Sequence, residues 1–229
     1  MPGKVTQLSA WRDVRIFLDP ADATGDSGPG FTVTPMRTGV VIRLGDDGGP
    51  ELVRMRWGFS ASNSGRFALK HMHARSETVD SSQRFGEAFA ERRGILMVET
   101  FNEGQELAGG AKKQFVVRPR DGKPLALAVI WEEWQGDDGA VLTFNMLTVP
   151  ANPAISSIEE RMPAVLHRDH WPLWLGQDDA ELDELKALLC THDDGGMWEI
   201  TEQAPPKSAK TVKEPTTPKA PKPTQGELF

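Results

Sequence analysis

The chain has 229 residues, a net charge of −7 and one cysteine, Cys190, which excludes a disulfide framework and suits a reducing cytoplasm. Its length can bury a sizeable core, whereas no apolar run approaches the ~20 residues of a membrane span and no signal-peptide core follows the first residues. Residues 54–123 carry 13 Lys/Arg against 8 Asp/Glu, whereas residues 132–200 carry 3 against 15. Because binding depends on the local field, the negative net charge does not exclude binding to nucleic acid.

Strand-like runs dominate the first 150 residues. Each is rich in Val, Ile, Leu and aromatic residues, and Gly/Asp turns separate them. The predicted strands are Thr32–Leu44, Leu52–Phe59, Ile95–Thr100, Gln114–Arg118, Leu125–Trp134 and Val141–Val149.

Two segments have helical spacing. Ser82–Arg93 places Phe85 and Phe89 one turn apart behind a serine cap. Asp178–Cys190 begins with acidic residues and predicts that Leu182, Leu185 and Leu189 share one face. Many strands with few helices predict an α+β domain around a curved sheet or barrel-like core.

The composition changes abruptly near residue 204. Residues 204–223 hold six Pro and five Lys with almost no large apolar side chains, so we expect a disordered tail. The expected organisation is a domain over residues 1–203 and a tail over 204–229.

Four short blocks carry most of the remaining information: Met1-Pro2-Gly3, His73–Thr78, Gly94–Gly104 and Glu159–Pro163. In this order and spacing they resemble the SOS response-associated peptidase family, also called abasic-site processing proteins. The resemblance extends over residues 1–176 and includes Met55-Arg-Trp-Gly-Phe59. It implies a β-rich domain that binds single-stranded DNA with an abasic site and takes part in the response to DNA damage.

The resemblance also implies four catalytic positions, where the family has an N-terminal Cys, an Asn, a Glu and a His. This chain has Pro2, His73, Glu103 and Glu159 at these places, and it retains only the Glu. Pro2 supplies no thiol. If Met1 is removed, its secondary amine can attack an aldehyde and form an iminium, an electron sink that favours a lyase reaction. The alternative is that Pro2 replaced a nucleophile that is no longer needed.

The other three positions have two interpretations each. Glu103 can move protons during addition and dehydration, and a nearby Glu159 would raise one carboxyl pKa; the alternative is a degenerate site. His73 can hydrogen-bond sugar or phosphate, or have no role. His71 and His73 share a strand face, but no cysteine is near, so we expect neither a metal nor another cofactor.

Four residues are predicted to contact DNA. Arg56, Arg75 and Arg161 can pair with phosphates or internally with Glu77, and sequence does not choose. Among the tryptophans, Trp57 is the one expected to stack on a base.

The last five residues, Gln225–Phe229, resemble peptides that bind the bacterial sliding clamp. The predicted anchors are Gln225, Leu228 and Phe229. An apolar pair after a polar tail suits a peptide that docks in a groove, and an inert terminus is the alternative.

Three hypotheses follow for a protein expected to be monomeric. The first is an abasic-site sensor that reacts through Pro2, and the second is a DNA-binding module without chemistry. The third is a repurposed hydrolase built on Glu103, Glu159 and His73. Whether the protein is an enzyme is left open by the sequence.

Overall fold

The structure is a computed structural model that describes residues 1–7, 31–60, 69–136, 139–191 and 196–203. Its strands are β1 (Lys4–Gln7), β2 (Phe31–Val33), β3 (Thr38–Leu44), β4 (Pro50–Trp57), β5 (Phe59–Ser60), β6 (Leu69–His71), β7 (His73–Arg75), β8 (Arg93–Glu106), β9 (Lys112–Pro119), β10 (Leu125–Gly136), β11 (Gly139–Pro150), β12 (Arg161–Pro163) and β13 (Trp198–Gln203). The helices are α2 (Gly86–Glu91), the 3-10 turn η2 (Arg168–His170), α3 (Trp171–Leu175) and α4 (Leu182–Ala187).

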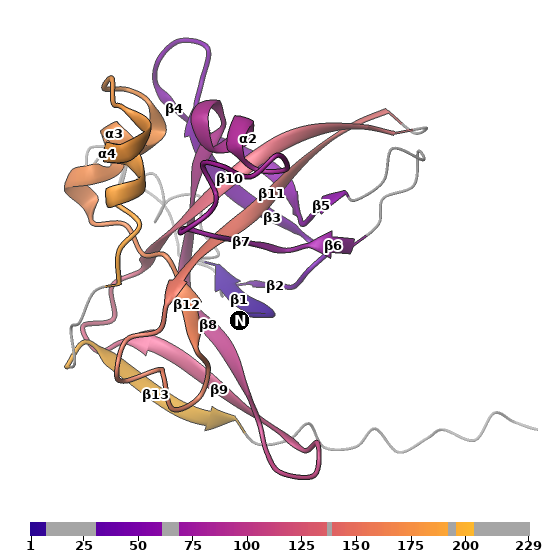
Figure 1. Cartoon of the computed structure of the whole chain (residues 1–229), viewed down its shortest axis with the longest axis vertical. Coiled ribbons are helices and arrows are strands. Elements are labelled where there is room, and N and C mark those ends of the chain that lie inside the picture. The colour runs from indigo at the N-terminus through magenta and orange to yellow at the C-terminus, as the bar shows by residue number, and fades with distance from the viewer. Residues whose placement is uncertain (8–30, 61–68, 137–138, 192–195, 204–229) are drawn as a thin grey trace, which may run out of the picture.

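Eleven of the strands form one mixed sheet, which confirms the predicted α+β class (Figure 1). Its main path runs β10-β11-β4-β3-β8-β1-β2, with β7 and β12 beside β11 and with β9 and β13 beyond β8. β11 pairs in parallel with β4 and β7, while the other described pairings are antiparallel. β5 and β6 form a separate two-stranded sheet.

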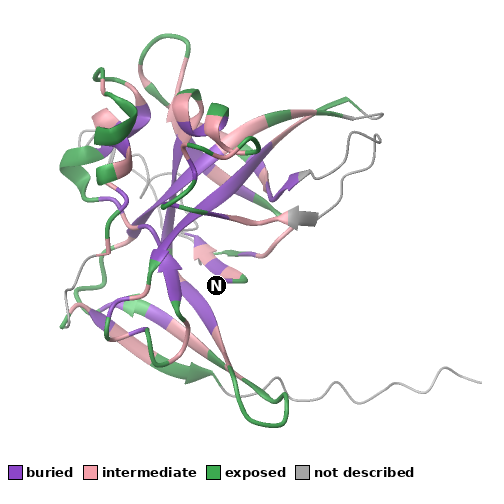
Figure 2. Cartoon of the chain, viewed as in Figure 1, coloured by how far each residue is buried: buried purple, intermediate pink, exposed green. Residues whose placement is uncertain are grey.

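The long strand β8 joins the parts of this sheet. Its first residues pair with β10, its middle pairs with β1, and Phe101–Glu106 pairs with β9. The apolar run Ile95–Val98 is almost entirely buried, as is most of β11 (Figure 2). A strand that is covered on both faces reads as a continuous apolar run, and this is why the sequence pattern is strong here.

The N-terminal strand β1 lies between β2 and β8, so the start of the chain is part of the sheet. Gln7 ends β1 and is 3% exposed. Its side-chain amide donates to the carbonyls of Val40 and Met97, and its side-chain oxygen accepts from the Val40 N–H. These bonds replace backbone pairing at a register shift in the β1–β8 ladder, and they hold β1 in place.

The predicted strands are confirmed, but their bounds and the helices differ. The run Thr32–Leu44 is two strands, because a turn at Thr34–Arg37 puts Met36 at φ 68°. The helix predicted over Ser82–Arg93 is only α2, and that over Asp178–Cys190 is only α4. Leu185 and Leu189 are buried whereas Leu182 is 43% exposed, so the core covers only part of the predicted leucine face.

Sequence reasoning missed α3, a single helical turn that closes one side of the core. Its Trp174 is fully buried and donates its indole N–H to the Gly94 carbonyl at 2.8 Å. The half-buried guanidinium of Arg93 donates to the Trp174 carbonyl at 2.7 Å. Within the described ranges, no helix has the length and apolar character needed to cross a membrane.

We predict that Gly94→Ala destabilises the fold by about 1–3 kcal/mol, because the added methyl overpacks the core. A Cβ at this position would lie 2.7 Å from Cγ1 of Val41 and 2.9 Å from the backbone oxygen of Ile42. Urea unfolding followed by tryptophan fluorescence measures the change. Gly196→Ala is the matched control, since its Cβ would meet nothing within 4 Å. Equal unfolding midpoints for the two variants would contradict this account of the β3–β8 contact.

Candidate functional site

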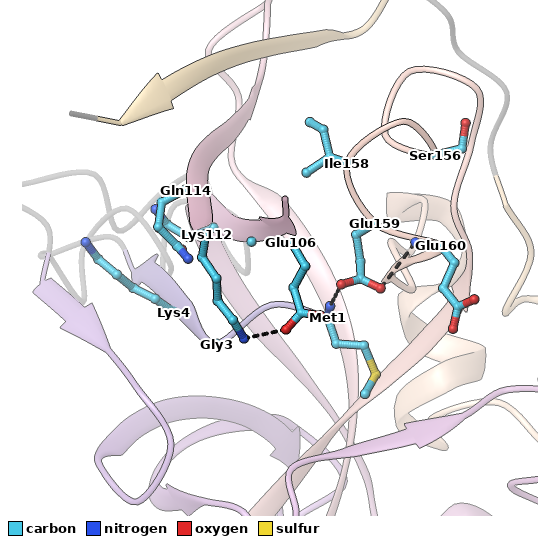
Figure 3. A pocket seen from close by; sticks show the side chains of 12 residues that line it. Met1, Gly3, Lys4, Glu106, Lys112, Gln114, Ser156, Ile158, Glu159 and Glu160 are labelled. Carbon is cyan, nitrogen blue, oxygen red and sulfur yellow. Dashed lines mark hydrogen bonds and ion pairs between the residues drawn. The ribbon is translucent and has the colours of Figure 1, made fainter. Parts of the chain in front are cut away.

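The amino terminus lies between two carboxylates. The Met1 nitrogen is 3.1 Å from Oε2 of Glu103. It is also 2.7 Å from Oε2 of Glu159 (Figure 3). The Glu103 side chain is fully buried, and that of Glu159 is 25% exposed. Neither Glu103 oxygen has a partner of regular hydrogen-bond geometry among the described residues. We therefore treat this contact as an ion pair.

Two elements bring these groups together. β1 begins at Lys4, which pairs with Asn102 of β8, so Glu103 lies directly beside the terminal residues. Glu159 comes from the turn between β11 and β12. The Asn152 side chain accepts from the Ile155 N–H in this turn, and Gln105 of β8 donates to the Ser157 carbonyl. The sheet fixes the first carboxylate, and an anchored turn presents the second.

Burial changes the chemistry of Glu103. Loss of solvent raises the pKa of its carboxyl to about 7, against the lowering effect of the terminal ammonium and with a smaller raising effect from Glu159. A carboxyl with such a pKa can give or take a proton near neutral pH. The structure thus brings Glu103 and Glu159 into one site, as we expected, and Glu103 is the group whose pKa rises.

His73 contacts the N-terminal segment. Its Nε2 lies 2.9 Å from the carbonyl oxygen of Pro2, and its ring meets the edge of Trp57 at a centroid distance of 5.7 Å. Burial lowers the pKa of His73 to about 4, so the ring is neutral near pH 7. Pro2 itself is buried. His73 and Pro2 are therefore in direct contact.

A pocket of about 570 Å³ opens at the terminus. Lys4, Lys112 and Gln114 lie on one side of it, and Ser156, Glu159 and Glu160 lie on the other, with Met1 between them (Figure 3). Sequence reasoning missed Lys4 and Lys112. The signal for Lys4 was its place two residues after Pro2. Lys112 had no such signal, because only the β8–β9 pairing brings it to the pocket.

Arg161 does not reach this pocket as a free cation. It is 7% exposed, and both of its terminal nitrogens donate to the Glu77 carboxylate at 2.8 Å. These hydrogen bonds lower the pKa of Glu77 to about 2. The internal pair with Glu77, one of the two alternatives from the sequence, is the arrangement present. The guanidinium is used in holding β12 to the residues after β7.

Trp57 also differs from its expected place. It is fully buried, it stacks on Phe144, and its indole N–H donates to the Met72 carbonyl at 2.9 Å. No ring face is accessible, so this placement counts against base stacking and makes Trp57 a core residue that supports His73.

The two remaining arginines project in different directions. Register places Arg56 beside Thr143 of β11, but places His73 and Arg75 beside residues 146 and 148. Because side chains alternate along a strand, Arg56 lies on the opposite face of the sheet from His73. Arg75 is exposed on the same face as His73. Of the predicted arginines, Arg75 is the exposed cation on the sheet face that carries His73.

The prediction of no metal site has no test here. Among the described residues no cluster of three metal-binding side chains occurs. The predicted clamp anchors, Gln225, Leu228 and Phe229, lie outside the described residues.

We predict that wild-type protein carrying Met1 loses stability relative to Glu103→Gln as pH rises from 5 to 8. The pKa of the Glu103 carboxyl is higher in the folded protein than in the unfolded chain. The stability that this carboxyl contributes is therefore fully present below the unfolded pKa, and it is lost as the pH rises toward the folded pKa of about 7. The difference in the free energy of unfolding between wild type and Glu103→Gln should change by about 2–3 kcal/mol over this pH range. Urea unfolding at each pH measures it. Glu99→Gln, an exposed carboxyl on the same strand, is the control; a flat difference for both variants would refute the burial effect.

Comparison with known proteins assigns this geometry to a family. Residues 1–203 match the model of the family described as SOS response associated peptidase (SRAP). The abasic site processing protein YoaM of Bacillus subtilis is 26% identical over 202 residues, which cover 86% of this chain and 88% of YoaM. The abasic site processing protein HMCES of Gallus gallus is 27% identical over 163 residues, 60% of this chain and 48% of HMCES.

The fold agrees with a solved relative. A crystal structure of a protein from Bordetella bronchiseptica superposes with a TM-score of 0.72 and 19% identity, and covers 88% of this chain and 99% of its own. At that identity the likeness shows the fold alone. The family match over the whole domain goes further: this chain belongs to the SOS response associated peptidase (SRAP) family.

Proposed function

We propose that this protein acts on single-stranded DNA containing abasic sites and reacts with the sugar aldehyde through the amine of Pro2, after removal of Met1. Its relatives YoaM and HMCES are named abasic site processing proteins, which supports a DNA abasic-site role. The observation that carries the proposal is the terminal amine at the mouth of a pocket, in contact with the buried Glu103. An amine beside a proton donor is what carbonyl addition needs.

Removal of Met1 is required for this reaction. With Met1 present, the terminal ammonium is paired with two carboxylates, and the Pro2 nitrogen is an amide without nucleophilic character. Hydrolysis of the first peptide bond frees the Pro2 nitrogen as a secondary amine. Because consecutive Cα atoms are ~3.8 Å apart, the new amine starts within one residue of the old one, between two residues that line the pocket, Met1 and Gly3.

In the proposed reaction, Glu103 carries the protons. The neutral Pro2 amine attacks the aldehyde carbon, forming the C–N bond, and the amine proton passes to the oxygen to give a carbinolamine. Protonated Glu103 then donates to the hydroxyl, which leaves as water, and a cationic iminium remains beside the Glu103 carboxylate. That carboxylate can take a proton from the next sugar carbon, so the C–O bond to the 3′ phosphate breaks by β-elimination. Exposed Arg75 and half-buried Lys4 are cations that can pair with the DNA backbone.

We predict that borohydride traps a covalent complex between the protein and an abasic single strand, because it reduces the iminium to a stable amine. Intact mass should match the chain without Met1 plus the strand, and peptide mapping should place the link on Pro2. Lys4→Gln and Lys112→Gln are matched controls that remove the two lysine amines of the pocket and should still be trapped. A strand with a reduced abasic sugar should give no complex.

Two results would contradict this proposal. A protein whose terminus is confirmed as Pro2 and that still gives no complex cannot use iminium chemistry. A link that maps to Lys4 or Lys112 assigns the reaction to a different amine.

We further predict a bell-shaped pH profile for the trapping rate. The amine must be neutral, which fails below its typical pKa of about 7.7–8.0, and Glu103 must be protonated, which fails above its pKa of about 7. Glu103→Gln should lower the rate about 10²-fold and remove the fall at high pH. Single-turnover trapping rates from pH 5.5 to 9.5 test this, with Glu99→Gln as the control. A retained alkaline fall in Glu103→Gln would assign the proton to another group.

One observation favours a second candidate, a DNA-binding module without covalent chemistry. In the chain with Met1, the terminal amine is held in ion pairs with Glu103 and Glu159, and the Pro2 nitrogen is an amide. If Met1 is retained in the purified protein, this candidate replaces the first. It predicts salt-sensitive binding to single strands and no trapped product.

Two finer proposals rest on sequence alone. Tethering to a sliding clamp rests on Gln225, Leu228 and Phe229, and a hydrolase on this fold would use Glu103, Glu159 and His73. Both stay predictions, as do a cytoplasmic location and a monomeric state.

A further inference from the structure

We infer that His73 is a positioning residue that holds the Pro2 carbonyl and thereby aims the terminal amine at the pocket. This inference rests on the proposed reaction of Pro2. It differs from the sequence-based expectation that His73 contacts DNA, because the imidazole Nε2 is already directed at the protein's own backbone.

The contact fixes the protonation of the ring. The Pro2 carbonyl oxygen only accepts hydrogen bonds, so the 2.9 Å contact requires the proton on Nε2. Burial also keeps the imidazole neutral near pH 7, which leaves Nδ1 without a proton. The contact joins residues 71 positions apart, so it ties β7 to the N-terminal segment.

The backbone around His73 is held from three directions. Trp57 donates its indole N–H to the Met72 carbonyl, and the Met146 N–H donates to the same oxygen at 3.2 Å. The side-chain amide of Asn145 donates to the His71 carbonyl at 2.7 Å. The ring edge of Trp57 then packs against the imidazole itself. His73 therefore presents Nε2 from a rigid support.

The anchor is suited to an N-terminal proline. The ring of proline removes freedom within the residue, and only one torsion separates its nitrogen from its carbonyl. With that carbonyl held by His73 and Lys4 paired in β1, the direction of the nitrogen is largely set. The hydrogen bond is made to Pro2 and not to Met1, so it survives removal of Met1.

We predict that His73→Phe lowers the rate of trapping on abasic DNA about 10²-fold, since a reacting atom displaced by about 1 Å loses that much. Phe fills the same space without a donor. His73→Gln should restore most of the rate, because its amide donates and reaches about as far as Nε2. Glyceraldehyde is a small aldehyde that can reach the amine in any orientation. Its rate of reaction should change less than about threefold in either variant, because this rate depends on the amine and not on the direction in which the amine points.

Several results would overturn the inference. His73→Phe trapping DNA at the wild-type rate would do so, as would an equal loss toward DNA and glyceraldehyde. Nitrogen-15 NMR of wild-type imidazole gives an independent arm that needs no variant to fold and no reaction to occur. A neutral ring with its proton on Nε2 from pH 5.5 to 8 supports the anchor, and a proton on Nδ1 alone overturns it. If wild-type protein gives no DNA complex, the proposed function fails. The NMR measurement then still shows whether His73 holds the Pro2 carbonyl.

Discussion

The site depends on the insertion of the N-terminal strand into the sheet. A chain terminus usually frays, since few contacts oppose its conformational entropy. Here β1 pairs with β2 and β8, and the buried Gln7 side chain bonds to Val40 of β3 and Met97 of β8. The first residues are consequently held as firmly as a core strand. An amine on such a strand has a defined position, which an amine on a free terminus does not have.

Burial of Glu103 creates a second dependence. Its carboxyl lies where water does not reach, so the ionised form is stable only while a cation is near. The terminal ammonium supplies that cation in the chain with Met1. The burial that makes Glu103 useful for proton transfer therefore also weakens the fold at neutral pH, a conflict typical of functional sites. Arg161 and Glu77 show the opposite case, because their charges are matched and hydrogen-bonded.

The sequence predicted the strands well because buried strands such as Ile95–Val98 leave a continuous apolar signal. It also brought Pro2, His73, Glu103 and Glu159 together through resemblance. It failed where tertiary contacts decide. Trp57 and Arg161 are residue types that often contact DNA. However, Trp57 stacks on Phe144 and donates to the Met72 carbonyl, and Arg161 donates to Glu77. Lys112 reaches the pocket through strand pairing across a hairpin, and single-turn helices such as α3 are too short for a periodic pattern.

The origin of Glu159 on an anchored turn divides the pocket into two parts that can change separately. Glu103 lies on β8, between β1 and β9, and its side chain is fully buried, so a residue of another size there disturbs packing as well as charge. The turn from Asn152 to Glu160 meets the sheet through its own hydrogen bonds, such as that between Gln105 and Ser157. A different side chain at position 159 would alter the acidity of the pocket while the strands stay in register. The fold can in this way keep one proton carrier and exchange its partner.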